Sequence, residues 1–506
     1  MTARLLSYPL ILVLTGLSCL AMLIPALHAL VIEDHSVAQA FFYSSVLGLV
    51  LVLTVAMAMS GRKRPDNSDI ENLASLFLAY TILPLFLALP FYEGLETTSF
   101  LNAYVEMVSS LTTTGATLFD RPERLVDSLH LWRGIVGWLG GLLIWVSASA
   151  VLASMYLGGF EITVSSEPGQ SDLRTARFER ASSARRLAQV TKELAPIYLG
   201  LTGALWVMLL ISGDAPMTAA VHAMSTMSTS GISSVGGVDQ ATSGFAGEAV
   251  IFLFMLFALS RLTFSTDTMN TTRASLLKDP EFRIGMALVI GVPLLLFSRH
   301  WLAAFEVDEV ESFSDAINAL WGGMFTVLSF LSTTGFESAS WTTARDWSGL
   351  GTPGLVLLGL AILGGGVATT AGGVKLLRVY ALYLNGQREM ERLIHPSSVG
   401  RVSSFSRRIR KRGAFIAWIF FMLFALSLAI VTMVMAALGQ DLESALVLTI
   451  AALATAGPLT QAAADTPIAL IEMSTAAKLV FSAAMVVGRM ETLAIIALFN
   501  PGLWRD

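Results

Sequence analysis

Cysteine is almost absent from this chain of 506 residues, and charged residues are scarce. The one cysteine, Cys19, excludes a disulfide within a single chain and a cysteine metal site. Charged residues make up 14% of the sequence against 54% for hydrophobic residues, and the mean hydropathy is +0.68, which excludes a soluble globular domain. This composition is typical of an integral membrane protein.

Common catalytic motifs are absent as well. The sequence contains neither His-Glu-x-x-His nor Gly-x-Ser-x-Gly. Its six histidines are scattered without metal-ligand spacing: His28, His35, His130, His222, His300 and His395. We therefore predict that the chain is not an enzyme, holds no covalently bound cofactor and binds no nucleic acid.

Long apolar runs recur along the whole chain. Four examples are Leu10 to Val31, Ala40 to Met59, Leu131 to Leu157 and Gly413 to Leu438. Each reaches the roughly 20 residues that cross a hydrocarbon core of about 30 Å. The first run is longer than a signal-peptide core and no clear cleavage site follows it, so we interpret it as a transmembrane helix.

Basic residues predict the orientation of these spans. If successive spans cross the membrane in alternate directions, most basic residues fall on one side, which we predict to be the cytoplasm. They are Arg62, Lys63, Arg64, Arg174 through Lys192, Arg273, Lys278, Arg283 and Arg378 through Arg412. Both termini then lie in the cytoplasm. The stretch from Ser165 to Arg186 is the longest polar linker. The cluster from Arg407 to Arg412 either fixes orientation, which we favour, or docks an acidic lipid or protein.

A short apolar segment that ends in Thr-x-Gly occurs four times. The four sequences are SSLTTTG, STMSTSG, SFLSTTG and AALATAG, and their glycines are Gly115, Gly231, Gly335 and Gly457. Each segment lies between full-length apolar runs, and the preceding helical stretch of about 10 to 14 residues is too short to cross a bilayer. We interpret each one as a re-entrant pore loop.

Non-helical backbone at membrane depth is tolerated only where it is buried in protein or lines water. If the four loops converge, glycine permits the positive φ angles that turn successive carbonyls toward one axis. A ring of carbonyls can replace the hydration shell of a monovalent cation. The alternative is that glycine only permits close helix packing. Four copies of the segment, each between full-length apolar runs, make this alternative less attractive. The predicted cation-binding residues are Thr113, Thr114, Gly115, Thr229, Ser230, Gly231, Thr333, Thr334, Gly335, Thr455, Ala456 and Gly457.

Span, pore loop and span, repeated four times after two extra N-terminal helices, resembles the TrkH/KtrB superfamily of potassium transporters, and bacterial TrkH most closely. The resemblance extends from about Asn72 to Arg505 and includes His222 and the step Gly488-Arg489. It implies K+ as the transported ion, because potassium-selective members have glycine in every loop. It also implies a homodimer in the bacterial inner membrane and a cytosolic nucleotide-binding TrkA-type subunit. Ser230, Ala456 and Pro458 depart from the family pattern.

A glycine-rich break interrupts the apolar run from Leu350 to Tyr380. Its residues include Gly364, Gly365, Gly366, Thr369, Thr370, Gly372, Gly373 and Lys375. So many glycines are costly in a helix, at roughly 1 kcal/mol each. The resemblance implies that this break is an intramembrane gate beneath the loops, and that Arg489 in the last helix blocks leak there. The alternatives are a flexible turn with a snorkelling lysine and a purely structural arginine.

The predicted fold is an all-α polytopic membrane protein with four helix–pore loop–helix repeats and pseudo-four-fold symmetry. We place an N-terminal helix pair at 1–66 and the repeats at 67–160, 161–275, 276–400 and 401–506, with the broken helix at 364–375. The alternative function is a cation-coupled secondary symporter with discontinuous helices, in which Asp267 is a candidate coupling carboxylate. A structural subunit would not explain four similar loops.

Overall fold

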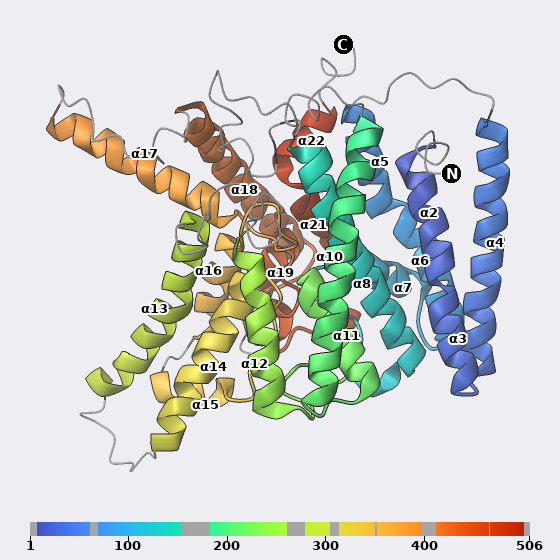
Figure 1. Ribbon diagram of the computed structural model, residues 1–506. Helices are drawn as coiled ribbons and strands as arrows, with labels where there is room; N and C mark the ends of the chain where they lie inside the picture. The colour runs from blue at the N-terminus through green and yellow to red at the C-terminus, as the bar shows by residue number, and fades with distance from the viewer. Residues whose placement is uncertain are drawn as a thin grey trace.

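The computed structural model describes residues 8–60, 69–153, 155, 157, 183–260, 279–303, 313–349, 352–395, 411–464 and 466–499. Over these ranges the chain is helical and contains no strand. Most of the helices run side by side in one bundle, and α17 projects away from it (Figure 1). The predicted all-α fold is confirmed.

The N-terminal pair forms as predicted. One span is built from α2 (Leu10–Ala21) and α3 (Leu23–Val31), and the other is α4 (His35–Met59). The break between α2 and α3 follows from Pro25, which lacks the N–H that would bond the carbonyl of Ala21 four residues earlier.

Each of the four predicted repeats contains a first span, a helix before the loop glycine that we call the pore helix after its predicted role, and a second span. In repeat 1 these are α5 (Asp69–Thr81) with α6 (Leu83–Gly94), α7 (Phe100–Leu111), and α8 (Asp127–Ser147) with η2 (Ala148–Leu152). In repeat 2 they are α10 (Ser183–Ile211), α11 (Pro216–Ser228), and α12 (Gly244–Met255) with η3 (Leu256–Leu259). In repeat 3 they are α13 (Pro280–Ala303), α14 (Phe313–Leu331) and α16 (Gly354–Leu363), with α15 (Trp341–Ser348) before α16 and α17 (Leu376–Ile394) after it. In repeat 4 they are α18 (Lys411–Ala437), α19 (Leu442–Leu453) and α21 (Thr475–Met490), with α20 (Leu459–Ala462) and α22 (Thr492–Phe499) beside them.

The repeats close into a ring through their second spans. The second spans α8, α12, α16 and α21 pack on the pore helices of their own repeats, α7, α11, α14 and α19. Each also packs on the pore helix of the next repeat: α8 on α11, α12 on α14, α16 on α19, and α21 back on α7. This cyclic order is the one that the predicted pseudo-four-fold arrangement requires.

Several elements differ in length from the expectation. Pore helix α14 has 19 residues, more than the predicted 10 to 14. Within the described ranges seven helices are long and apolar enough to span a membrane, because the second spans of repeats 2 and 3 are shorter and that of repeat 4 is bent. The last span, expected to be continuous, bends by 94° between α21 and α22. Glu491 at that bend has a φ of 64°, which no helix residue adopts.

Some predicted features lie outside the described residues. They are the repeat boundaries near 66, 160, 275 and 400, residues 165–182 of the polar linker, the cluster from Arg407 to Arg410, and Asp267. The repeat limits therefore stay predictions.

Two glycines allow second spans to lie directly on pore helices. A Cβ on Gly140 of α8 would lie 2.1 Å from the carbonyl oxygen of Leu111, and one on Gly488 of α21 would lie 2.4 Å from that of Leu453. Leu111 and Leu453 end their pore helices at equivalent positions, four residues before the loop glycine. Small residues are needed at such close approaches.

We predict that Gly140→Ala and Gly488→Ala each lower the free energy of unfolding by about 2 kcal/mol, because the added methyl group meets backbone that cannot yield easily. The measurement is thermal unfolding of the purified protein in detergent. Gly200→Ala in α10 is the matched control, since no atom lies within 4 Å of its Cβ position. Equal stability of all three variants would contradict close packing as the reason for these glycines.

Candidate functional site

The four predicted loops meet, although about 100 residues or more of chain separate one from the next. Gly115, Gly231, Gly335 and Gly457 all line a single cavity of about 240 Å³. The structure thus brings together the residues that the repeated Thr-x-Gly pattern singled out.

Neighbouring loops touch through their backbones, and three contacts follow one rule. A Cβ on Gly115 would lie 1.6 Å from the carbonyl oxygen of Ser230, one on Gly231 would lie 2.2 Å from that of Thr334, and one on Gly457 would lie 2.6 Å from that of Thr114. Each glycine therefore faces the residue that precedes a glycine of the adjacent loop. No side chain fits at these three positions.

The loops leave their pore helices in the same way. The threonine two residues before each glycine adopts a left-handed conformation, with φ of 53° at Thr113, 51° at Thr229, 59° at Thr333 and 52° at Thr455. The next residue donates its N–H to the carbonyl oxygen of the small residue that stands six before the glycine: Thr114 to Ser109, Ser230 to Ser225, Thr334 to Ser329 and Ala456 to Ala451, at 2.9 to 3.0 Å. Left-handed β-branched residues are strained, and such strain is concentrated at functional sites.

Loop 4, around Gly457, departs from the other three. Gly115, Gly231 and Gly335 have φ of 74°, 67° and 85°, whereas Gly457 is not in the left-handed region, so that prediction was wrong for this glycine. The physical reason is Pro458, which restricts the residue before it to extended backbone. The N–H of Gly457 donates instead to the carbonyl oxygen of Thr114 at 2.6 Å, so loop 4 rests on loop 1.

Paired hydroxyls support the first three loops and are missing from the fourth. Thr112 and Thr114 share a hydrogen bond of 2.8 Å, Ser228 donates to Ser230 at 3.0 Å, and Ser332 and Thr334 share one of 2.9 Å. The equivalent residues in loop 4 are Ala454 and Ala456, which have no hydroxyl. The sequence departures at Ala456 and Pro458 therefore have structural consequences.

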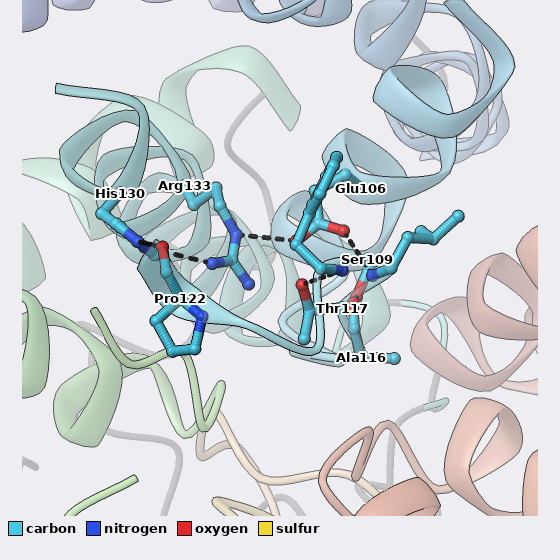
Figure 2. Close-up of polar contacts among 9 residues, drawn as sticks. Glu106, Ser109, Ala116, Thr117, Pro122, His130 and Arg133 are labelled. Atoms are coloured by element: carbon cyan, nitrogen blue, oxygen red, sulfur yellow. Dashed lines mark hydrogen bonds and ion pairs between the residues drawn. The ribbon is translucent and has the colours of Figure 1, made fainter. Parts of the chain in front are cut away.

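A buried ion pair stands behind loop 1 (Figure 2). The carboxylate of Glu106 on α7 accepts from the N–H of Leu118 at 2.9 Å and pairs with Nε of Arg133 on α8 at 2.7 Å. Arg133 also donates to Nδ1 of His130 at 3.3 Å, and Nε2 of His130 lies 2.9 Å from the carbonyl oxygen of Pro122. Glu106 and Arg133 are 1% and 4% exposed, so each depends on the other for charge balance. The repeated Thr-x-Gly pattern does not include either residue.

Three acidic residues line the same cavity beyond the glycines: Asp120, Asp239 and Glu337. Burial and the neighbouring Asp239 raise the pKa of Glu337 to about 7, although Arg345 opposes the shift. Burial and Glu472 likewise raise the pKa of Asp120. The three acidic residues stand at different distances in sequence after their loop glycines, so the repeat pattern does not reveal them.

The glycine-rich segment lies directly against the loops. The N–H of Gly372 donates to Oγ1 of Thr333 at 2.7 Å, and Oγ1 of Thr370 donates to the carbonyl oxygen of Met227 at 3.2 Å. A Cβ on Gly372 would lie 2.2 Å from Oγ1 of Thr455. The segment thus touches repeats 2, 3 and 4.

The remaining predicted gate residues hold this segment in shape. Oγ1 of Thr369 donates to the carbonyl oxygen of Gly366. The N–H of Gly366 donates to the carbonyl oxygen of Ala258. Gly364 and Gly373 have φ of 70° and 75°, and a Cβ on Gly365 would lie 2.7 Å from the carbonyl oxygen of Ala258.

Two basic side chains reach the same segment. Nζ of Lys375 donates to the carbonyl oxygen of Ala371, and Nη1 of Arg489 donates to that of Thr370 at 2.8 Å. Arg489 therefore lies beside the glycine-rich segment. Nearby, Glu491 pairs with Arg378 at 2.6 Å, and the guanidinium of Arg378 lies 3.7 Å from the ring centroid of Phe420.

We predict that Arg133→Met lowers the free energy of unfolding by about 3 to 5 kcal/mol, because it leaves the buried carboxylate of Glu106 without its cation. Thermal unfolding in detergent measures the effect. The double variant Glu106→Leu/Arg133→Met should regain most of the loss. Arg392→Met is the control, since the Arg392–Glu389 pair is about half exposed and is worth at most about 1 kcal/mol. A loss no larger than the control's would contradict this account of the pair.

Comparison with known proteins supports one assignment. The chain is 29% identical over 491 residues to the Trk system potassium uptake protein TrkH of Salmonella typhimurium and 28% identical over 495 residues to that of Escherichia coli K12, with 96% of each chain covered in both cases. The crystal structure of the potassium transporter TrkH from Vibrio parahaemolyticus superposes with a TM-score of 0.82 at 25% identity and covers all of both chains. The family model of the cation transport protein TrkH matches residues 37–504. This chain belongs to the TrkH family of cation transport proteins.

Proposed function

We propose that this protein carries potassium ions across the bacterial inner membrane, through the ring formed by its four Thr-x-Gly loops. The observation that supports this most strongly is that four glycines from four repeats line one cavity. Relatives that align with 96% of the chain are named potassium uptake proteins.

The loops offer the ligands that a dehydrated K+ needs. Carbonyl oxygens of four loops can replace a hydration shell, and the pore helices direct their partly negative C-terminal ends toward the loops. The hydroxyls of Thr113 and Thr455 are buried and lack a hydrogen-bond partner among the described residues. Orphaned buried oxygens of this kind suit a passing cation. The acidic residues that line the cavity would raise the local cation concentration.

The glycine-rich segment is the proposed gate. It lies against the loops through Gly372 and Thr370, and it is held there by Arg489. A segment in this place closes the path below the ring, and the positive charge of Arg489 repels cations. Opening then requires the segment to leave its hydrogen bonds with Thr333 and Met227.

The Trk system to which the named relatives belong suggests further subunits. We propose a homodimer of this chain with a cytosolic nucleotide-binding TrkA-type subunit that controls the gate. Both termini would lie in the cytoplasm, as the distribution of basic residues indicates.

Expression in a bacterium that lacks potassium uptake tests the transport proposal. Wild type should restore growth at low K+ and support rubidium influx, while Gly115→Ser and Gly335→Ser should reduce the preference for K+ over Na+ by at least about tenfold, because the side chain displaces the adjacent loop.

Gly349→Ser is the matched control for these two variants. Gly349 has a φ of 55°, yet no atom lies within 4 Å of its Cβ position, so backbone strain occurs without displacement of a loop. Failure of the inserted wild type to transport K+, even with a cognate cytosolic partner, would refute the assignment and favour the symporter.

The gate proposal predicts leak when Arg489 is removed. In proteoliposomes that contain this chain alone, Arg489→Ala should raise rubidium influx about tenfold, because it removes one charged hydrogen bond from the closed segment. Arg283→Ala, at an exposed arginine of α13, is the control and should leave influx unchanged. Influx at the wild-type level in Arg489→Ala would show that Arg489 does not hold the gate closed.

A further inference from the structure

Glu248 is a buried carboxylate in α12, the second span of repeat 2. Glu248 is 2% exposed, and apolar residues flank it along the helix. In the described part of the chain it forms no ion pair, which distinguishes it from Glu106. A charged residue at membrane depth is costly and usually serves a function.

Three donors converge on this carboxylate from repeat 3. Oε1 accepts from the N–H of Ala339 at 2.7 Å, and Oε2 accepts from Oγ of Ser338 at 2.7 Å and from Nε1 of Trp321 at 2.8 Å. Ser338 and Ala339 lie three and four residues after Gly335, in the segment that follows loop 3. Glu248 therefore ties this segment to a helix of the preceding repeat.

Loops 1 and 2 are tied at the corresponding place by residues of their own pore helices. Glu106 stands nine residues before Gly115 and accepts from the N–H of Leu118, and His222 stands nine before Gly231 and lies 2.8 Å from Oγ of Ser233.

The residue at this position in repeat 3 is Thr326, and its hydroxyl accepts from the N–H of Ser338 only at 3.4 Å, a weak contact. In repeat 4 the position holds Leu448, whose side chain cannot form a hydrogen bond. Glu248 thus supplies for loop 3 the strong attachment that Glu106 and His222 supply for loops 1 and 2.

We propose that Glu248 is a positioning residue that determines the preference of the ring for K+ over Na+. It does so from the neighbouring repeat, by fixing the outer end of loop 3, which is the segment at Ser338 and Ala339. This inference depends on the proposed potassium transport. Preference among cations requires that the ring keep its number and spacing of carbonyl oxygens. A loop released at its outer end can close around the smaller Na+, so loss of this attachment lowers the preference without blocking transport.

The test compares Glu248→Ala and Glu248→Gln with wild type in proteoliposomes, with rubidium and sodium influx both measured per inserted protein. Glu248→Ala should reduce the Rb+ over Na+ influx ratio about tenfold, because all three donors lose their acceptor. Glu248→Gln should reduce it less, since one amide oxygen still accepts while the NH₂ group faces a donor.

Trp321→Phe is the matched control at the same carboxylate. It removes the indole donor but leaves the contacts to Ser338 and Ala339, so the influx ratio should stay within about twofold of wild type. A second readout is thermal unfolding of the purified protein in KCl and in NaCl, because bound cation stabilises the folded state. The difference between the two salts should shrink in Glu248→Ala and persist in Trp321→Phe.

The outcomes separate this inference from the transport proposal. An unchanged influx ratio in both Glu248 variants overturns it, as does a proportional loss of both fluxes with an unchanged ratio. If Glu248→Ala does not insert, Glu248→Gln and its unfolding in the two salts decide the matter. A wild-type protein that transports no K+ would instead refute the proposed function itself.

Discussion

The structure depends on one constraint, the need to support non-helical backbone at membrane depth. Lipid offers no hydrogen-bond partners, so four loops can exist there only if other parts of the protein surround them. The cyclic packing of α8, α12, α16 and α21 meets this need, because each of these second spans covers the pore helix of the next repeat. A single repeat could not do so alone, since the adjacent loop lies against each glycine. The closed ring is therefore a condition of stability as well as the proposed path for the ion.

Close approach within the ring limits which residues the loops can contain. Ser230, Thr334 and Thr114 present carbonyl oxygens where a side chain on the facing glycine would stand. Loop 4 meets the same limit on close approach in a different way. Pro458 removes the left-handed glycine conformation, alanines replace the paired hydroxyls, and the N–H of Gly457 bonds loop 1 directly. The ring is therefore pseudosymmetric in its helices and asymmetric in its loops.

Buried charge in this protein serves the non-helical segments. Glu106 with Arg133 supports loop 1, and Glu248 holds loop 3 through donors alone. Arg489 contacts the glycine-rich segment. In each case a carboxylate or guanidinium satisfies backbone groups that have no helical partner, which offsets the cost of placing that charge in an apolar interior. Charges therefore mark the places where regular structure ends.

The sequence by itself determined the fold class, the two extra helices, the four loops and the glycine-rich break, because apolar length and the repeated Thr-x-Gly are local signals. Only the tertiary structure decided that the loops meet in cyclic order and that Gly457 lies on loop 1. It also decided that Arg133 and Glu337 line the cavity, and that Glu106 and Glu248 accept hydrogen bonds from the backbone that follows loops 1 and 3. The reason is physical: these partners lie in different helices or repeats, as Glu248 and Ser338 do, and sequence periodicity reveals which face of a helix is buried but not which distant donor meets it.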